Sequence, residues 1–171
     1  MSRHVLSVLV ENQSGVLSRV AGLFSRRGYN IDSLSVGETE DPKVSRMTIV
    51  VRGDHYILEQ IKKQLNKLID VIKIVELSPN NSICRELALI KVKTTMQNRA
   101  SVIEIVSIFR ANIVDVSRET LTVEMTGDES KIDAFINLME SYGIVEVVCT
   151  GLSAIERGEK SIKNREENEE D

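Results

Sequence analysis

The sequence has few of the side chains from which catalytic and metal centres are built. Its 171 residues include two histidines and two cysteines, and aromatic residues make up 4% with no tryptophan. Two cysteines cannot form the disulfide framework of a small secreted protein. An RNA-recognition domain needs aromatic side chains on its central strands to stack bases, and the corresponding segments 5–10 and 46–51 hold none. The composition therefore disfavours metal chemistry and base stacking.

Long hydrophobic runs and dense basic patches are also missing. No apolar run reaches the roughly 18 residues that a membrane-spanning helix needs, and the N-terminus has no signal-peptide pattern. We therefore expect a cytoplasmic protein with no membrane partner. The net charge is −4, and the first 78 residues hold 11 basic and 9 acidic side chains. This balance does not suit a phosphate-binding surface, so nucleic acid is not expected as a partner.

The histidines and cysteines that are present form no recognisable centre. His4 and His55 stand apart, without a nucleophile elbow or a metal-ligand spacing, and we interpret both as surface residues. Cys84 and Cys149 form no CxxC motif, which disfavours a metal chaperone. They lie at the outer ends of two segments that we expect to pair as neighbouring strands. Two reduced, half-buried thiols are favoured over a disulfide, and the sequence leaves both open.

Hydrophobic periodicity divides the first half of the chain into six elements. Residues 16–27 have apolar side chains at helical spacing, and the glycine that follows is typical of a helix end. Asp54 can cap a second helix, which runs from residue 55 to about residue 68. The segment 5–10 is apolar on both faces, which indicates a central strand. The other strands are predicted at 31–36, 46–51 and 71–77, and the turn-forming residues 78–82 mark a domain boundary.

The second half repeats the order βαββαβ. Strands are predicted at 86–92, 113–116, 120–126 and 144–149, and helices at 100–110 and about 129–139. Such a unit normally folds as a ferredoxin-like sandwich with strand order 4-1-3-2, which leaves the second strand at an exposed edge. The prediction is an α+β protein of two tandem ferredoxin-like sandwiches.

The predicted domains are residues 1–78 and 84–152. Each domain is near the lower size limit for a self-sufficient core, so mutual packing or oligomerisation is expected. Residues 157–171 hold one isoleucine among charged and polar residues. We predict that they form a disordered acidic tail, because so little apolar surface cannot offset the entropy of ordering.

One loop has a pattern that suits a ligand. Asn12, Ser14 and Gly15 lie between the first strand and the first helix, where free backbone N–H groups and the helix dipole attract a carboxylate. Asn30 begins the edge strand, so in an edge-paired dimer it can reach the same loop of the other chain. The spacing alone is equally consistent with a structural role, in which Asn12 and Ser14 are turn and cap residues and Gly28 ends the helix.

The residues around this loop resemble the ACT domain, a family that binds small molecules, mostly amino acids, and regulates metabolic enzymes. The pattern is Glu-Asn-x-x-Gly-Val-Leu from Glu11, followed by Gly-Tyr-Asn-Ile from Gly28. The longer stretch 6–34, with Ser-Arg-Met-Thr-Ile at 45–49, resembles the small regulatory subunit of acetohydroxyacid synthase (acetolactate synthase). The second half resembles the C-terminal domain of that family more loosely, and the acidic tail lies outside the pattern.

The resemblance implies a non-catalytic subunit without a cofactor or metal of its own. In that family a large subunit with thiamine diphosphate, magnesium and FAD condenses two pyruvates, or pyruvate with 2-oxobutyrate. The small subunit raises this activity and confers feedback inhibition by a branched-chain amino acid, usually valine. The resemblance implies a homodimer joined through its ACT domains, with the large subunit as partner. It implies effector-binding positions at Asn12, Gly15 and Asn30, and lining positions at Ser14, Val16, Leu17 and Ile31.

The alternative is a stand-alone ACT-type amino-acid sensor that regulates another enzyme or transcription. The sequence has no helix-turn-helix and no basic region, which disfavours DNA. It does not rank valine, leucine and isoleucine as effector, because one methylene changes affinity in an apolar pocket by only about 1–3 kcal/mol.

Overall fold

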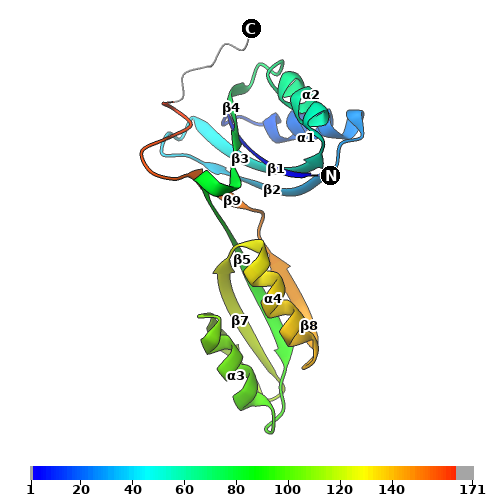
Figure 1. The fold of residues 1–171 in the computed structure, drawn as a ribbon, viewed down its shortest axis with the longest axis vertical. Helices are drawn as coiled ribbons and strands as arrows, with labels where there is room; N and C mark the ends of the chain where they lie inside the picture. The colour runs from blue at the N-terminus through cyan, green and yellow to red at the C-terminus, as the bar shows by residue number, and fades with distance from the viewer. Residues whose placement is uncertain (1, 165–171) are drawn as a thin grey trace. The chain divides into compact units, whose positions relative to one another are not determined.

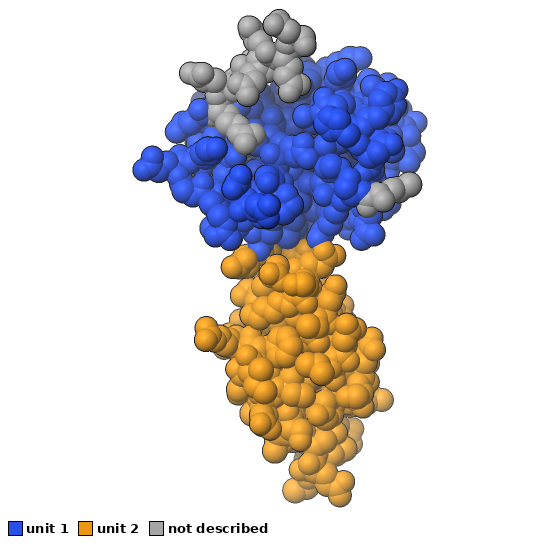
Figure 2. Space-filling model, viewed as in Figure 1, with its two compact units in different colours: residues 1–84, 151–171 blue, residues 85–150 orange. Residues whose placement is uncertain are grey.

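The computed structural model describes residues 2–164, which form two compact units. Unit 1 contains the chain up to Cys84 and again from Gly151, and unit 2 is Arg85–Thr150 (Figure 2). Each unit contains the element order βαββαβ (Figure 1). The predicted α+β fold of two tandem ferredoxin-like sandwiches is therefore confirmed.

Unit 1 is built on a four-stranded antiparallel sheet. Its strand order is β2-β3-β1-β4, which is the predicted order with β2 at an edge. In the middle of the sheet, Val8 of β1 lies opposite Met47 of β3 and Ile74 of β4. The elements are β1 (Ser2–Glu11), α1 (Val16–Arg27), β2 (Ile31–Glu38), β3 (Val44–Gly53), α2 (His55–Leu65) and β4 (Val71–Leu77), followed by the 3-10 turn η1 (Pro79–Asn81).

The helices of unit 1 begin and end near the residues that the sequence indicated. Gly28 follows α1 with φ +69°, a left-handed conformation that favours glycine. The Asp54 side chain caps α2 by accepting a hydrogen bond from the Ile57 amide at 2.8 Å. Helix α2 ends at Leu65, earlier than predicted, because the chain turns there and the Leu68 amide donates to the Leu65 carbonyl at 3.0 Å. Leu68 still packs against the core.

Helices α1 and α2 lie side by side on one face of this sheet (Figure 1). Alternate residues of β1 point toward them, and Leu6 and Val8 are fully buried. Val20 and Phe24 of α1 complete the contact from the helix side. Side chains along a strand point alternately to its two faces, so this contact with the helices accounts for the apolar residues on one face of β1.

The opposite face of the same sheet is covered by residues 151–164, which we call the C-terminal strap. Within the strap, β9 (Ser153–Glu156) pairs with β5 (Ser82–Lys93), and the Arg157 amide then donates to the Asn81 carbonyl at 2.8 Å. The Leu152 amide donates to Ser33 Oγ of β2 at 2.8 Å. The buried apolar residues of this second layer are Val5, Leu9, Val50, Val75, Leu77, Leu152, Ala154 and Ile162. Strand β1 is thus buried on both faces, as its composition indicated.

The strap differs from the disordered tail predicted from residue 157. Ile162 is only 5% exposed and packs against the β1 face, so residues 157–164 belong to unit 1. The prediction considered only whether the segment could form a core of its own. One isoleucine is enough here because the apolar surface that it covers comes from the sheet. The rest of the predicted tail, residues 165–171, lies outside the described residues.

Unit 2 has the same topology, with strand order β6-β7-β5-β8. Both helices cover one face of its sheet (Figure 1). The rings of Phe109 and Phe135 meet edge to face in the core, with centroids 5.3 Å apart. Asp128 caps the second helix by accepting from the Lys131 amide at 2.9 Å. Besides β5, the elements are α3 (Arg99–Ile108), β6 (Asn112–Val116), β7 (Thr120–Gly127), α4 (Glu129–Glu140) and β8 (Ile144–Cys149).

Candidate functional site

The loop between β1 and α1 presents backbone amides at the start of a helix. Gly15 is the residue before the helix and has φ +86°, a conformation that L side chains rarely adopt. The first amide to donate back along the helix is that of Arg19, which reaches the Gly15 carbonyl at 3.0 Å. The amides of Leu17 and Ser18 come before this bond and have no partner within the helix. The loop therefore has a positive electrostatic potential and backbone N–H groups that can donate hydrogen bonds to a ligand.

Asn12 is bound to its surroundings through its side-chain nitrogen. Asn12 Nδ2 donates to the Pro42 carbonyl at 2.8 Å and to Glu38 Oε1 at 3.1 Å. The Asn12 backbone amide donates to the Lys43 carbonyl at 2.8 Å. Because both N–H groups of the side chain are used, what Asn12 can offer a ligand is its carbonyl oxygen.

Asn30 is used in a similar way at the other end of α1. Asn30 Nδ2 donates to Asp32 Oδ1 at 2.9 Å, and the second oxygen of Asp32 accepts from Arg52 Nε. Asn30 is exposed, and its side-chain oxygen is again an acceptor for a ligand. Both predicted asparagines therefore present oxygen, which suits an ammonium group.

The predicted site residues fall into two groups on the chain. Asn12, Ser14, Gly15 and Leu17 are exposed in and next to the loop, and Leu17 has 45% of its surface exposed although it is apolar. Val16 is different from the expected lining residue, because its side chain is 3% exposed and belongs to the core of unit 1.

Asn30 and the half-buried Ile31 lie beyond the far end of α1. This helix has 12 residues, so it separates the two groups by about 18 Å.

Strand β2 connects these two groups along the exposed edge of the sheet. It starts at Ile31, next to Asn30, and ends at Glu38, whose carboxylate is bound to Asn12. Asn30 therefore lies next to the first residue of β2, and Asn12 lies at its last residue. Within one chain, the two groups of predicted site residues stay apart.

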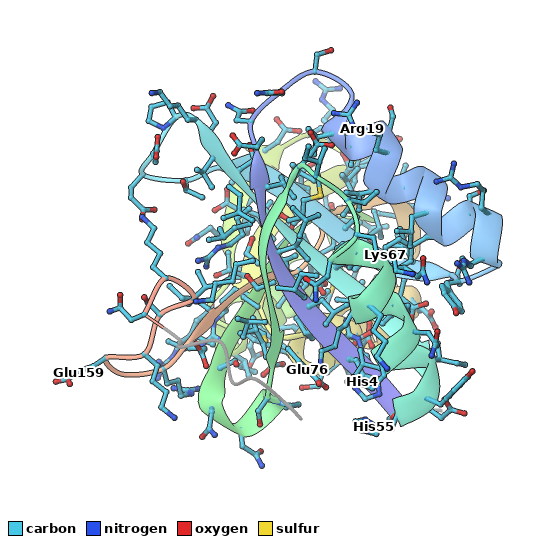
Figure 3. All side chains as sticks on the ribbon, turned by 90° about the horizontal axis from the view of Figure 1, so that it is seen from above. His4, Arg19, His55, Lys67, Glu76 and Glu159 are labelled. Carbon is cyan, nitrogen blue, oxygen red and sulfur yellow. The ribbon has the colours of Figure 1, made fainter. Side chains whose placement is uncertain are left out.

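The structure adds Arg19 and Asp70, which the sequence analysis did not single out. Arg19 Nε and Nη2 contact the two oxygens of Asp70 at 2.6 and 3.1 Å. The hydrogen bonds that Arg19 donates to the Asp70 carboxylate raise the pKa of Arg19, so the guanidinium stays charged. Figure 3 shows Arg19 beside the loop that follows β1. A basic residue one helical turn after a loop glycine is the signal that would have drawn attention to it.

The two histidines lie outside this loop, in β1 and at the start of α2. His4 is not a lone surface residue, because His4 Nδ1 lies 2.9 Å from Glu76 Oε1 and the side chain is mostly buried. His55 begins α2. Within residues 2–164, His, Cys, Asp and Glu side chains form no cluster of three that could hold a metal ion. The helices of the same range include none long and apolar enough to cross a membrane.

Neither Cys84 nor Cys149 is part of a disulfide. Cys149 lies opposite Ala88 in the β5–β8 pairing, four positions along β5 from Cys84, so the two are not paired neighbours. Burial, with Glu86 and Asp133 nearby, raises the pKa of the Cys149 thiol.

Comparison with known proteins identifies the family of both halves of the chain. A family described as an AHAS small subunit-like ACT domain matches residues 6–73, and one described as the small subunit of acetolactate synthase matches residues 85–158. The chain belongs to the acetolactate synthase small-subunit family. This confirms the resemblance on which the sequence analysis relied.

Individual members of the small-subunit family match over nearly the whole chain. A probable acetolactate synthase small subunit of Methanothermobacter thermautotrophicus is 52% identical over 160 residues, 93% of this chain and 95% of that protein. The acetolactate synthase small subunit of Mycobacterium leprae is 56% identical over 159 residues, covering 93% and 94%.

The crystal structure of the acetolactate synthase small subunit from Thermotoga maritima has a TM-score of 0.87 at 44% identity. The match covers 92% of this chain and 99% of that one. A small subunit implies a catalytic large subunit as its partner, and a regulatory role in branched-chain amino acid biosynthesis.

Proposed function

We propose that this chain activates the thiamine-diphosphate-dependent large subunit of acetolactate synthase and confers feedback inhibition by a branched-chain amino acid, most simply valine. The observation that carries the proposal is the loop of Asn12 and Gly15 at the start of α1. It combines free backbone N–H donors, which suit the carboxylate of an α-amino acid, with an acceptor oxygen, which suits its ammonium group. The proposed place of action is the cytoplasm.

The polar ends of valine match this loop by charge. The carboxylate binds the N–H groups at the start of α1, where the helix dipole favours an anion. The ammonium binds the side-chain oxygens of Asn12 and Asn30, whose nitrogens are held by Glu38, Pro42 and Asp32. The isopropyl group packs on Leu17 and Ile31, and Val16 supports the loop from the core side.

A complete effector site needs two copies of the chain. Asn12 and Asn30 lie at opposite ends of α1, about 18 Å apart by the rise of a helix. If two copies pair antiparallel through β2, the start of one β2 lies beside the end of the other. Asn30 of one copy then comes next to Glu38 and Asn12 of the other copy. The proposed homodimer therefore has two symmetry-related effector sites, and pairing also covers the exposed edge.

Inhibition requires that valine prefer one arrangement of the holoenzyme over another. A ligand shifts an equilibrium only by its difference in affinity between the two states. A site built from two copies has this property, because any change at the β2 edge moves Asn30 relative to the Gly15 loop. A coupling of about 1–3 kcal/mol between effector and enzyme is typical of allostery.

Calorimetric titration of valine into the full chain tests the site. The wild type should bind one valine per chain, and Gly15→Asp should abolish binding because its carboxylate occupies the donors and repels that of the ligand. Gly158→Asp is the matched control, since Gly158 is also exposed with φ +70° and lies in the strap. Undiminished binding by Gly15→Asp would locate the effector elsewhere.

A further inference from the structure

Arg19 covers the loop glycine from one turn further along α1. A Cβ placed on Gly15 would stand 3.0 Å from Arg19 Nη1. Helical side chains lean toward the N-terminus of their helix, which brings the guanidinium of residue 19 back over residue 15. A side chain at Gly15 would thus be strained by the positive φ and would press on the guanidinium that lies against it.

Asp70 holds this guanidinium in place. Asp70 is 8% exposed and binds Arg19 through Nε and Nη2. Its carbonyl oxygen also accepts from the Glu11 amide at 2.9 Å, which joins Asp70 to the last residue of β1. Nη1 is the guanidinium nitrogen that remains, and within residues 2–164 it has no hydrogen-bond acceptor. A fixed, charged donor therefore stands at the loop with its hydrogens unused.

We infer that Arg19 is a specificity-determining residue of the effector site and that its Nη1 donates to the carboxylate of the bound amino acid. The inference rests on the proposed function. It adds the Arg19 side chain to the backbone amides that bind the ligand carboxylate in that proposal. A guanidinium keeps its charge and its planar geometry, and here Asp70 fixes its orientation before the ligand arrives. The hydrogen bond to a carboxylate is charge-assisted and stronger than one to a neutral amide.

This role predicts selection for the carboxylate. Replacing the ligand carboxylate by a carboxamide removes the charge that Arg19 recognises and leaves the ammonium and the isopropyl group unchanged. The wild type should therefore bind valine more tightly than valinamide. Loss of the guanidinium should weaken valine binding about tenfold or more and leave valinamide binding unchanged.

The test is calorimetric titration of valine and valinamide into the full-length wild type, Arg19→Gln and Arg26→Gln. Titration at about pH 6.5 keeps the ammonium of both ligands protonated. Arg26 is the matched control, because it is an exposed arginine two turns further along the same helix. Arg19→Gln should lower the preference for valine over valinamide about tenfold or more, and Arg26→Gln should keep it unchanged.

A second variant guards against misfolding. Arg19→Gln leaves Asp70 as a buried carboxylate without its cation, so the double variant with Asp70→Asn removes both charges and should give the same ligand pattern. Equal weakening of both ligands would make Arg19 purely structural and overturn the inference. If the wild type binds valine and Arg19→Gln keeps the full preference for valine over valinamide, the role of Arg19 is overturned and the proposed function stands. A wild type that binds no branched-chain amino acid would overturn the proposed function as well.

Discussion

At the residue scale, the proposed chemistry depends on which atoms of each side chain are already bound. Asn12 uses both side-chain N–H groups inside the chain and Asn30 uses one of its two, and each keeps its side-chain oxygen for the ligand. The sequence could predict these asparagines from their spacing and family resemblance. It could not predict the orientation of Asn12, because its partners Glu38 and Pro42 lie 26 and 30 residues further along the chain and meet it only in the fold.

The pair of Arg19 and Asp70 is separated by 51 residues. Nothing in the local pattern around Arg19 announces its partner, because the contact depends on how α1 packs beside the turn before β4. Residues that act through such distant pairs are the ones that sequence reasoning misses. Gly15 was predicted for its backbone freedom, and the structure adds the close approach of Arg19 as a second reason.

Cys149 gives a pH-dependent prediction at this scale. Its raised pKa means that less thiolate, the reactive form, is present at a given pH. In a Cys84→Ser background, the rate of iodoacetamide alkylation against pH should have its midpoint above about 8.5, the value of an ordinary thiol. A small free thiol measured in parallel is the control. A midpoint at or below that of the free thiol would contradict the assigned environment.

At the element scale, the C-terminal strap differs most from the sequence prediction, because residues 157–164 belong to unit 1. Segment 5–10 is apolar on both faces, and this pattern predicted a central strand that is buried on both sides. Which segment covers the second face could not be predicted, because Leu152, Ala154 and Ile162 are scattered among polar residues. Helix caps such as Asp54 and Gly28 were predictable because their signals are local.

The strap prediction concerns the stability of unit 1. Ile162→Ala should lower the free energy of unfolding by about 2–4 kcal/mol, because it removes a buried side chain and leaves a cavity against β1. Ile155→Ala is the control, since Ile155 belongs to β9 but is 53% exposed. Urea denaturation followed by circular dichroism measures both. Equal and small effects of the two changes would mean that the strap contributes little to the fold.

At the scale of the whole molecule, the proposed effector site belongs to a dimer and not to a chain. This can be tested with two variants that each lose valine binding, Asn12→Ala and Asn30→Ala. In a dimer of one variant with the other, one site carries both changes and the second site is intact. After mixing and random exchange, about a quarter of all sites should bind valine again, as two-fold symmetry requires.

Calorimetry of the mixture against each variant alone measures the recovery. Native mass spectrometry of the same mixture, with one variant isotope-labelled, shows whether mixed dimers form. If exchange occurs and the two variants together recover no binding, Asn12 and Asn30 do not meet across an interface. The two-copy site would then be rejected while membership in the small-subunit family stands.

The central claim is that this chain regulates a catalytic large subunit in response to valine. The direct measurement is acetolactate formation by an acetolactate synthase large subunit from the same source, alone and with this chain, at increasing valine concentrations. Asn30→Ala separates the two effects, because it should keep the stimulation and lose the inhibition. The account predicts that the wild-type chain raises the rate and that valine lowers it again. An unchanged rate and no response to valine would contradict the account and favour a stand-alone amino-acid sensor.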